Sequence, residues 1–158
     1  MGCGRPLTGA TGDAATAALI AAAHVARHNA YAPYSGFSVG AAVLTGDGQI
    51  HSGCNLENAS YGLSLCAEAG ALAATAVAGQ IAQIRAIAIV GGPAGSPALS
   101  TITPCGRCRQ MLAEAQAVAE QPIAIYCAGE EGDAITCYSV DELLPHGFGA
   151  AILNRKED

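Results

Sequence analysis

Small apolar residues, alanine above all, fill three stretches of the chain that each predict a helix. The stretches cover residues 14–32, 65–79 and 106–119. Asp13 precedes the first stretch and is a residue type that favours the N-cap position, and Pro33 ends this stretch because proline cannot continue a helix. The sequence therefore predicts three helices.

Four shorter apolar runs between and after these helices predict β-strands. They cover residues 37–44, 49–54, 85–90 and 122–127. Gly and Asp at residues 45–48 mark a turn, so the first two runs are predicted to form an antiparallel hairpin. The order of helix, hairpin, helix, strand, helix and strand fits a mixed sheet with helices on its faces, whose last two strands are parallel and joined by a helical crossover.

Length and composition set the size of the core. The chain has 158 residues, of which 51% are apolar, enough for one compact domain that covers residues 1–158. Residues 1–12 are predicted to be a flexible start to this domain.

The charge balance excludes some classes of partner. Seven Lys and Arg face thirteen Asp and Glu, which gives a net charge of −6. Nucleic acid and anionic membranes both need a positive protein surface, so neither is expected as a partner. No uncharged apolar run reaches the roughly 18 residues of a membrane span, and the first residues lack a secretory layout. We therefore expect a cytoplasmic protein.

Seven cysteines in a reducing compartment are expected to be ligands, nucleophiles or core residues, not disulfides. Cys105 and Cys108 lie three positions apart at the start of a predicted helix, where two thiolates can share one ion. A Cys-x-x-Cys pair alone is ambiguous between a redox disulfide, half of a structural zinc site and a catalytic metal site. Cys66 opens another predicted helix and would supply a third sulfur, leaving zinc one vacant position for water.

Glu68 follows Cys66 by two positions, and side chains two apart converge on one point only at the end of a helix. Over the first turn, Cys66 would bind the metal while Glu68 accepts a proton from the bound water and returns it to substrate. The small residues 69–71 are predicted to let this helix approach the Cys105 helix closely. The positive helix N-termini are predicted to lower the pKa of the thiols.

Two other interpretations of the cysteines remain open at this point. A closed structural zinc site would take a fourth sulfur from Cys54, Cys127 or Cys137. Alternatively, Cys105 and Cys108 would form a redox pair. The presence of Glu68 favours the open catalytic site. Cysteines that do not bind metal, Cys3 among them, are expected to be buried or inert.

The two cysteine elements match a known signature. Cys66-Ala67-Glu68 and Pro104-Cys105-Gly106-Arg107-Cys108 fit the all-cysteine form of the zinc deaminase motif. Together with AYAPYSGFSVGAAV, GCNLENASYG and LLPHGF, in order from residue 30 to 148, they make the chain resemble the small, homotetrameric cytidine deaminases. This resemblance implies an α/β fold, a three-layer αβα sandwich with a mixed five-stranded sheet.

The resemblance also implies an activity: hydrolytic deamination of cytidine and 2′-deoxycytidine to uridine and 2′-deoxyuridine, with ammonia released, in pyrimidine salvage. It implies one Zn²⁺ per subunit, held by Cys66, Cys105 and Cys108. Zinc hydroxide would attack C4 of the base while Glu68 protonates N3 and then the departing amine. The partners implied are a small nucleoside substrate and further copies of the chain, in a tetramer with shared active sites.

Several residues are assigned to substrate by the same resemblance. Asn55 and Glu57 face the same way in extended backbone and would hold the ribose 3′ hydroxyl. The remaining assignments are Phe37 lining the base pocket, Ala67 at the substrate, Phe148 stacking on the base from a neighbouring subunit, Tyr61 reaching the 5′ side of a nucleoside bound next door, and Tyr34 near the subunit contact. The four histidines are expected to have surface or structural roles.

One position departs from the family pattern. The commonest element in the family reads Cys-Ala-Glu-Arg, and here Ala69 follows Glu68, so a cation near the thiolates is missing. Arg109 and the helix ends are the candidates to compensate the negative charge. Two rival functions remain: a deaminase of another aminopyrimidine nucleoside, such as blasticidin S, and a catalytically silent protein that binds zinc or nucleosides. Asn55, Glu57 and Phe148 favour the plain nucleoside, and Glu68 argues against a silent protein.

Overall fold

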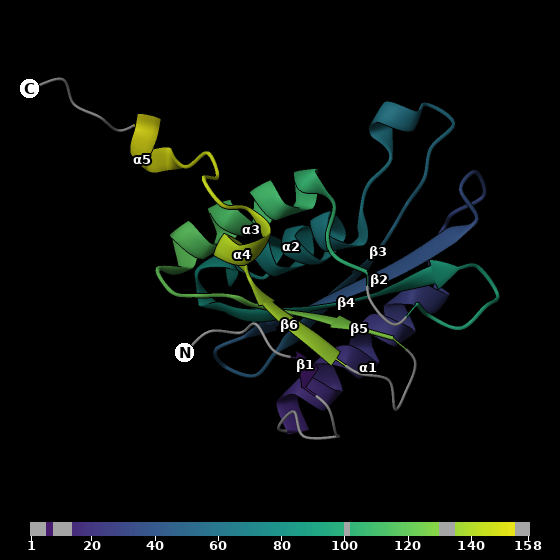
Figure 1. Cartoon of the computed structure of the whole chain (residues 1–158), viewed down its shortest axis with the longest axis horizontal. Helices are drawn as coiled ribbons and strands as arrows, with labels where there is room; N and C mark the ends of the chain where they lie inside the picture. Colours follow the sequence, from purple (N-terminus) through teal and green to yellow (C-terminus); the bar gives the residue numbers. More distant parts are fainter. Residues whose placement is uncertain (1–5, 8–13, 100–101, 130–134, 154–158) are drawn as a thin grey trace, which may run out of the picture.

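The computed structural model describes residues 6–7, 14–99, 102–129 and 135–153 (Figure 1). Its strands are β1 (Pro6–Leu7), β2 (Phe37–Thr45), β3 (Ile50–Cys54), β4 (Ile84–Pro93), β5 (Ala124–Ala128) and β6 (Ile135–Ser139). Its α-helices are α1 (Ala14–His28), α2 (Ala67–Val77), α3 (Gly106–Ala119), α4 (Val140–Leu143) and α5 (Ala150–Leu153), and two short 3₁₀ turns are η1 (Tyr61–Leu63) and η2 (Ile81–Gln83).

All six strands belong to one mixed sheet, in the order β1-β6-β5-β4-β2-β3. β4 and β5 are parallel, and each of the other neighbouring pairs is antiparallel. The parallel pair is joined through α3, as predicted. The predicted five-stranded sheet corresponds to β2 to β6, and the two-residue β1 adds a short edge.

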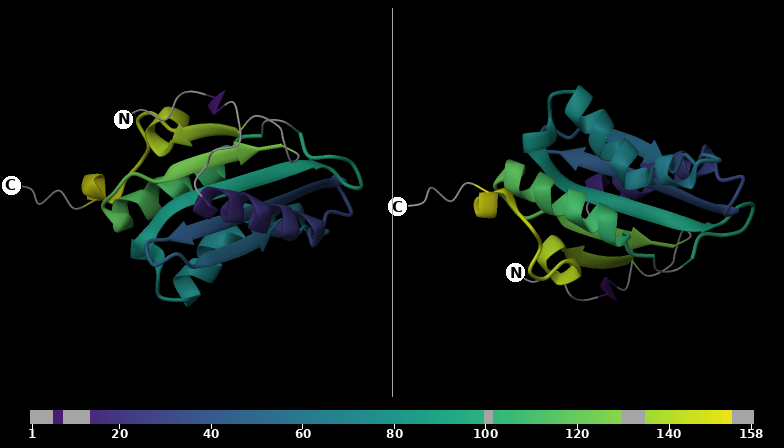
Figure 2. Two further views of the ribbon diagram at one scale, coloured as in Figure 1. Left: turned by 90° about the horizontal axis from the view of Figure 1, so that it is seen from below. Right: turned by 90° about the horizontal axis from the view of Figure 1, so that it is seen from above.

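Helices cover both faces of the sheet, which makes the three layers that were predicted (Figure 2). Alternate residues of β4 point to opposite faces because side chains alternate along a strand. Ile87 and Ile89 belong to the core cluster that contains residues of α2 and α3. Ala88 and Val90 belong to the cluster that contains residues of α1. The sheet is therefore buried on both sides.

Glycines on two neighbouring strands let the helices lie directly on the backbone of the sheet. A Cβ placed on Gly53 of β3 would lie 2.3 Å from the backbone nitrogen of Ala71 in α2. A Cβ on Gly40 of β2 would lie 2.0 Å from the carbonyl oxygen of Ala23 in α1. The position of α2, and of whatever its first turn carries, is thus set by contact with Gly53.

The predicted elements agree with the structure at most positions. The helix at 106–119 has the predicted bounds, the hairpin forms with β2 and β3, and α1 ends at His28, before Pro33. β4 continues to Pro93, beyond the predicted end of this strand at residue 90. β6, α4 and α5 were not predicted from the residues.

Pro6 and Leu7, which lie within the segment 1–12 that was predicted to be flexible, pair with β6. The rest of that segment, and the proposed N-cap Asp13, lie outside the described residues. Within the described part of the chain, no helix is long and apolar enough to cross a membrane.

Candidate metal centre

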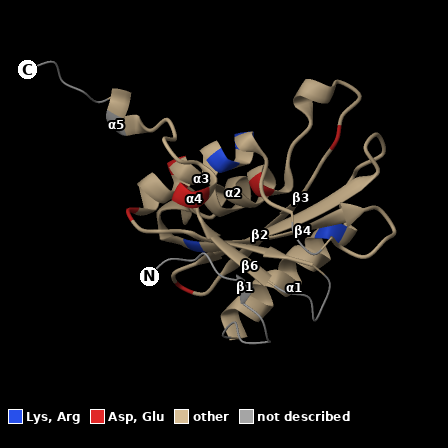
Figure 3. Ribbon diagram, viewed as in Figure 1, with Lys and Arg blue, Asp and Glu red and all other residues tan. Residues whose placement is uncertain are grey.

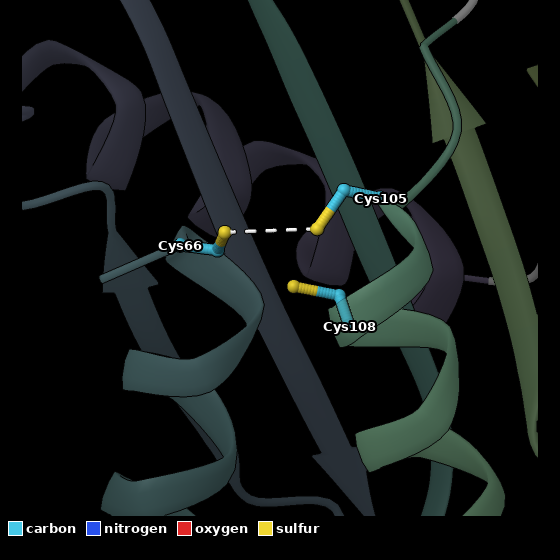
Figure 4. A group of neighbouring side chains, drawn as sticks. All are labelled: Cys66, Cys105 and Cys108. Atoms are coloured by element: carbon cyan, nitrogen blue, oxygen red, sulfur yellow. Dashed lines mark hydrogen bonds between the residues drawn. The ribbon is translucent and has the colours of Figure 1, made fainter. Parts of the chain in front are cut away.

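Three thiols meet where α2 and α3 begin (Figure 4). Cys66 is the N-cap of α2, Cys105 is the N-cap of α3, and Cys108 lies in the first turn of α3. Their three sulfur atoms lie within 4.8 Å of one another, and the Sγ atoms of Cys66 and Cys105 are 3.8 Å apart. The structure therefore brings together the three cysteines that the spacing indicated.

The sulfur arrangement fits a zinc ion. Sulfurs bound to tetrahedral zinc at about 2.3 Å lie about 3.8 Å from one another, which is the separation of Cys66 and Cys105. Thiolates are also the ligands that favour zinc among the divalent metals. Among the described residues this cluster contains three ligands and no fourth. An arrangement of this kind leaves one position of a tetrahedral ion for a molecule other than protein.

The other described cysteines do not complete a closed site. The Cys54 thiol donates to the carbonyl oxygen of Asn29 at 3.4 Å. Cys127 is buried in β5, and burial, with the negative charge of Glu68 as a smaller cause, raises its pKa to about 12. Cys137 is buried and disulfide-bonded, so the expectation that the cysteines form no disulfide is wrong at this position. Cys3 lies outside the described residues.

Glu68 lies in the first turn of α2, two positions after Cys66, with 4% of its surface exposed. Burial raises the pKa of this carboxyl group, while hydrogen bonds with its own backbone N–H and with Cys108 act in the opposite direction. A carboxyl group whose pKa is raised holds a proton more readily near neutral pH. The first turn of α2 thus places a proton-exchanging group beside the thiols.

The thiol pKa values differ in part from the prediction. Burial raises the pKa of Cys66 and of Cys108, and repulsion from nearby negative groups adds to this effect. The pKa of Cys105 is lowered: burial acts against this, but hydrogen bonds from Cys108 and Cys66 outweigh it. The prediction that helix ends lower all three pKa values is therefore wrong for two thiols. Three thiolates and a carboxylate that lie close together and partly buried repel one another. A bound cation would offset this repulsion and stabilise the charged forms.

Two of the three small residues after Glu68 make a contact with the sheet that was not predicted. Gly70 lies against Gly53 of β3, since a Cβ on Gly70 would be 3.5 Å from the Cα of Gly53. Ala71 also meets Gly53 through its backbone nitrogen. Gly70 and the backbone of Ala71 therefore seat α2 on the sheet, and Ala71 also belongs to the core cluster that contains residues of α3.

Asn55 and Glu57 lie against the same segment of chain, as their spacing predicted, but their polar atoms bind protein. The Asn55 side chain accepts from Val39 N and donates to Phe37 O, both at 2.8 Å. Glu57 accepts from the backbone N–H groups of Tyr34 at 2.9 Å and Ser35 at 3.1 Å. These bonds fix the turn that leads into β2.

Ser35 is a residue of this turn that the sequence analysis did not single out. Its hydroxyl donates to Glu57 and accepts from Phe37 N at 3.0 Å. The hydrogen bond from Ser35 is the largest cause that lowers the pKa of Glu57. Ser35 therefore keeps Glu57 ionised and holds Phe37 at the start of β2.

The aromatic residues assigned to substrate occupy two regions. Phe37 is half-buried and packs beside Gly91, whose added Cβ would be 3.3 Å from Phe37 Cε1. The rings of Tyr34 and Tyr61 are 5.8 Å apart, and Tyr61 is exposed. Phe148 lies between α4 and α5 with 55% of its surface exposed. Ala67, next to Cys66, is fully buried.

Arginine is sparse, and two of the four described arginines, Arg107 and Arg109, flank Cys108 in α3. Figure 3 shows Lys and Arg of the described residues in blue. Arg109, the candidate to offset the missing cation, donates to Pro104 O at 2.7 Å, Thr103 Oγ1 at 3.0 Å and Leu143 O at 3.1 Å. Its guanidinium therefore binds the loop that leads to Cys105. Arg27, which the sequence analysis passed over, is 6% exposed and binds the carbonyl oxygens of Ser38, Pro93 and Ser96.

Comparison with known proteins identifies the family to which this arrangement belongs. Residues 14–124 match the model of the cytidine and deoxycytidylate deaminase zinc-binding region. The chain therefore belongs to this zinc-binding deaminase family.

Individual relatives agree over most of the chain. It is 42% identical over 136 residues to a cytidine deaminase of Halalkalibacterium halodurans, covering 86% of this chain and 96% of the relative. It is 40% identical over 130 residues to a cytidine deaminase of Sporosarcina psychrophila, covering 82% and 88%. Among solved structures, a cytidine deaminase from Burkholderia pseudomallei matches with a TM-score of 0.73 and 44% identity, covering 84% of this chain and 98% of that one.

Proposed function

We propose that the protein is a zinc-dependent cytidine deaminase that converts cytidine and 2′-deoxycytidine to uridine and 2′-deoxyuridine by hydrolysis, with release of ammonia. The observation that carries this proposal is the meeting of three thiols and a buried carboxyl group at the first turns of α2 and α3. The family match and the cytidine deaminases among its relatives support it.

Each residue of this cluster has one role in the proposal. Cys66, Cys105 and Cys108 hold the metal. When bound there, zinc would supply Lewis acidity that lowers the pKa of a water molecule toward neutral pH. Glu68 would transfer the two protons of the water in turn: the first to N3 of the base, where it remains in the product, and the second to the departing amine, which leaves as ammonia. Its burial suits this task, because a raised pKa brings the carboxyl group closer to the working pH.

The substrate is held by the turn before β2 and by the residues after β3. Phe37 lines the space for the base, and Ala67, which is fully buried, is assigned to the substrate by its place next to Cys66. Asn55 retains one amide N–H, and Glu57 retains lone pairs, beyond the bonds they make to the protein. We assign these remaining groups to the ribose 3′ hydroxyl. A site built from such groups disfavours free cytosine, which lacks the sugar.

We further propose that the chain works as a single domain in a homotetramer with shared active sites. Apolar side chains are exposed together on residues 31–34 and 56–65; they are Tyr31, Tyr34, Leu56, Tyr61, Leu63 and Leu65. Gathered apolar surface of this kind marks a contact with another protein. In the assembly, Tyr61 and Phe148 reach the nucleoside of a neighbouring subunit. Light scattering at micromolar concentration is expected to give four times the mass of the chain, and a monomer would refute this part.

We also propose that the protein is cytoplasmic and acts in pyrimidine salvage. Cys54 and Cys127, two described cysteines outside the metal cluster, are free thiols, a state that a reducing compartment maintains. Recycling nucleosides from degraded nucleic acid requires an amine-removing step of this kind.

The test of the activity compares Glu68→Gln with wild type. Purified, zinc-analysed protein is incubated with cytidine, 2′-deoxycytidine, cytosine and blasticidin S, and the ultraviolet change on loss of the amine is followed. Glu68→Gln is expected to keep zinc and to lose at least about 100-fold in turnover, because it cannot carry the proton. Cys105→Ala is expected to lose both zinc and turnover.

Glu114→Gln is the matched control, since Glu114 is an exposed carboxylate on α3. It is expected to behave like wild type. Turnover of blasticidin S in preference to cytidine would replace the proposed substrate, and zinc-loaded wild type that deaminates none of the four compounds would overturn the proposal.

A further inference from the structure

Two successive residues of α3 bind the two ends of one segment, residues 143–148. Arg109 Nη1 donates to the carbonyl oxygen of Leu143 at 3.1 Å. Gln110 Nε2 donates to the carbonyl oxygen of Phe148 at 2.7 Å. α4, which ends at Leu143, lies beside α3 in the structure (Figure 1). The segment is thus attached to the same helix turn that follows Cys108.

The segment between these two bonds forms a compact turn. Leu144 N donates to Val140 O at 2.8 Å, and His146 has a φ of +62°. A Cβ on Gly147 would lie 2.9 Å from Cδ2 of Leu144, so the backbone passes directly over that side chain. Residues 144–148 lie between α4 and α5 and belong to neither a helix nor a strand. The segment is therefore held to α3 by side-chain hydrogen bonds, and not by the backbone hydrogen bonds that join the strands of the sheet.

The guanidinium of Arg109 links this segment to the loop of the thiols. It also donates to Pro104 O at 2.7 Å and Thr103 Oγ1 at 3.0 Å, immediately before Cys105. Gln110, one position further along, binds Phe148 and makes no hydrogen bond to the described part of that loop, residues 102–105. The two side chains therefore have separable effects: Arg109 acts on both the loop and the segment, and Gln110 acts on the segment.

We propose that Gln110 is a positioning residue that fixes the half-exposed ring of Phe148 for contact with the nucleoside of a neighbouring subunit. This inference rests on the proposed function, in which Phe148 stacks on the base. Gln110 itself touches no substrate. An aromatic group held in place before binding avoids the cost of ordering it on binding. Loss of the Gln110 bond therefore weakens substrate binding and leaves the chemical step unchanged.

The chain offers a direct measure of this positioning, because it contains only two phenylalanines, Phe37 and Phe148. Labelling with 4-fluorophenylalanine gives two fluorine NMR signals, and Phe148→Leu assigns them. In Gln110→Glu, the side chain keeps its length but loses the N–H donor. The Phe148 signal is expected to move toward the position of a free fluorophenylalanine, while the Phe37 signal stays in place.

Kinetics give the second readout. Gln110→Glu is expected to raise KM for cytidine about two- to tenfold, the effect of one lost hydrogen bond, with kcat within about twofold of wild type. Combining Gln110→Glu with Phe148→Leu is expected to raise KM no further than Phe148→Leu alone, because Gln110 acts through Phe148. Zinc content is expected to remain that of wild type.

Two further variants complete the design. Gln83→Glu introduces the same charge at an exposed glutamine of η2 and is the matched control. Gln110→Met removes the donor without adding charge, and it carries the test if Gln110→Glu does not fold. An unchanged Phe148 signal with unchanged KM overturns the inference, as does an equal change of both fluorine signals. If wild type deaminates nothing, the proposed function fails, and the fluorine signals still decide whether Gln110 positions Phe148.

Discussion

Substituting Gly53 by alanine is predicted to lower the affinity of the metal centre for zinc, because the new Cβ would push against the backbone of α2. The new Cβ would lie 2.3 Å from Ala71 N, 2.5 Å from Ala67 O and 2.7 Å from the carbonyl carbon of Gly70. All three are backbone atoms of α2, so a side-chain rotation cannot relieve the overlap. An ordinary contact of about 3.5 Å requires α2 to move by about 1 Å.

This movement has two measurable effects. Overpacking is expected to lower the free energy of unfolding by about 1–3 kcal/mol, and the melting temperature by about 2–12 °C. Because α2 starts at Cys66 and carries Glu68, its displacement also separates Cys66 from the thiols of α3. We expect zinc affinity to fall about 10- to 100-fold, the range for groups that orient metal ligands without touching the metal. Competition with a chromogenic chelator at neutral pH measures this affinity.

Gly40→Ala is the control, because its Cβ meets the backbone of α1 on the other face of the sheet, at 2.0 Å from Ala23 O and 2.4 Å from Arg27 N. It is expected to destabilise the fold at least as much as Gly53→Ala while zinc affinity remains that of wild type. The two variants are compared at a temperature where circular dichroism shows both folded. Equal zinc affinities in Gly53→Ala and Gly40→Ala would refute the reasoning.

Three further predictions concern the elements around the centre. Arg27→Met removes the side-chain donor that binds the carbonyl oxygens of Ser38, Pro93 and Ser96. The free energy of unfolding measured by urea titration is expected to fall by about 2–4 kcal/mol. A fall of less than about 1 kcal/mol would show that Arg27 does not stabilise this region as described. Hydrogen bonds from Ser35 lower the folded-state pKa of Glu57 below 4.5, so its stabilising effect is complete above that pH and disappears as pH falls through the folded pKa. The difference in unfolding free energy between wild type and Glu57→Gln, measured by urea titration, is therefore expected to decrease as the pH is lowered from 7 to 3. A difference that stays constant over this range would contradict the prediction. Ser139→Ala removes the capping box with Glu142 at α4 and is expected to lower the unfolding free energy by about 1 kcal/mol in the same assay, whereas an unchanged value would show that the cap contributes nothing.

The sequence alone predicted the elements whose signals are local. The bounds of α3 followed from an apolar stretch that begins after Cys105, and the hairpin of β2 and β3 followed from the glycines in its turn. The meeting of Cys66 with Cys105 and Cys108 was predicted because each cysteine stands at a helix start. The starts of α2 and α3 meet in the structure, so local signals sufficed to place the cluster.

Features that depend on distant neighbours were predicted less well. Residues 69–71 were expected to let α2 approach α3, but the contact of Gly70 and Ala71 with Gly53 of β3 was not predicted, because no local pattern shows the strand register. Asn55 and Glu57 point the same way, as their spacing required, yet their hydrogen-bond partners lie 16 to 23 residues earlier in the chain. α4, in contrast, carried a local signal that was not used: Ser139 and Glu142 form a capping box.

The proposed activity requires one zinc ion that is bound by three thiols and by no fourth protein ligand. Zinc K-edge X-ray absorption on the wild-type protein as purified tests this directly. We predict one zinc per chain with three sulfur neighbours at about 2.3 Å and one oxygen or nitrogen neighbour at about 2.0 Å. Four sulfur neighbours, or a protein that binds no zinc, would contradict the account.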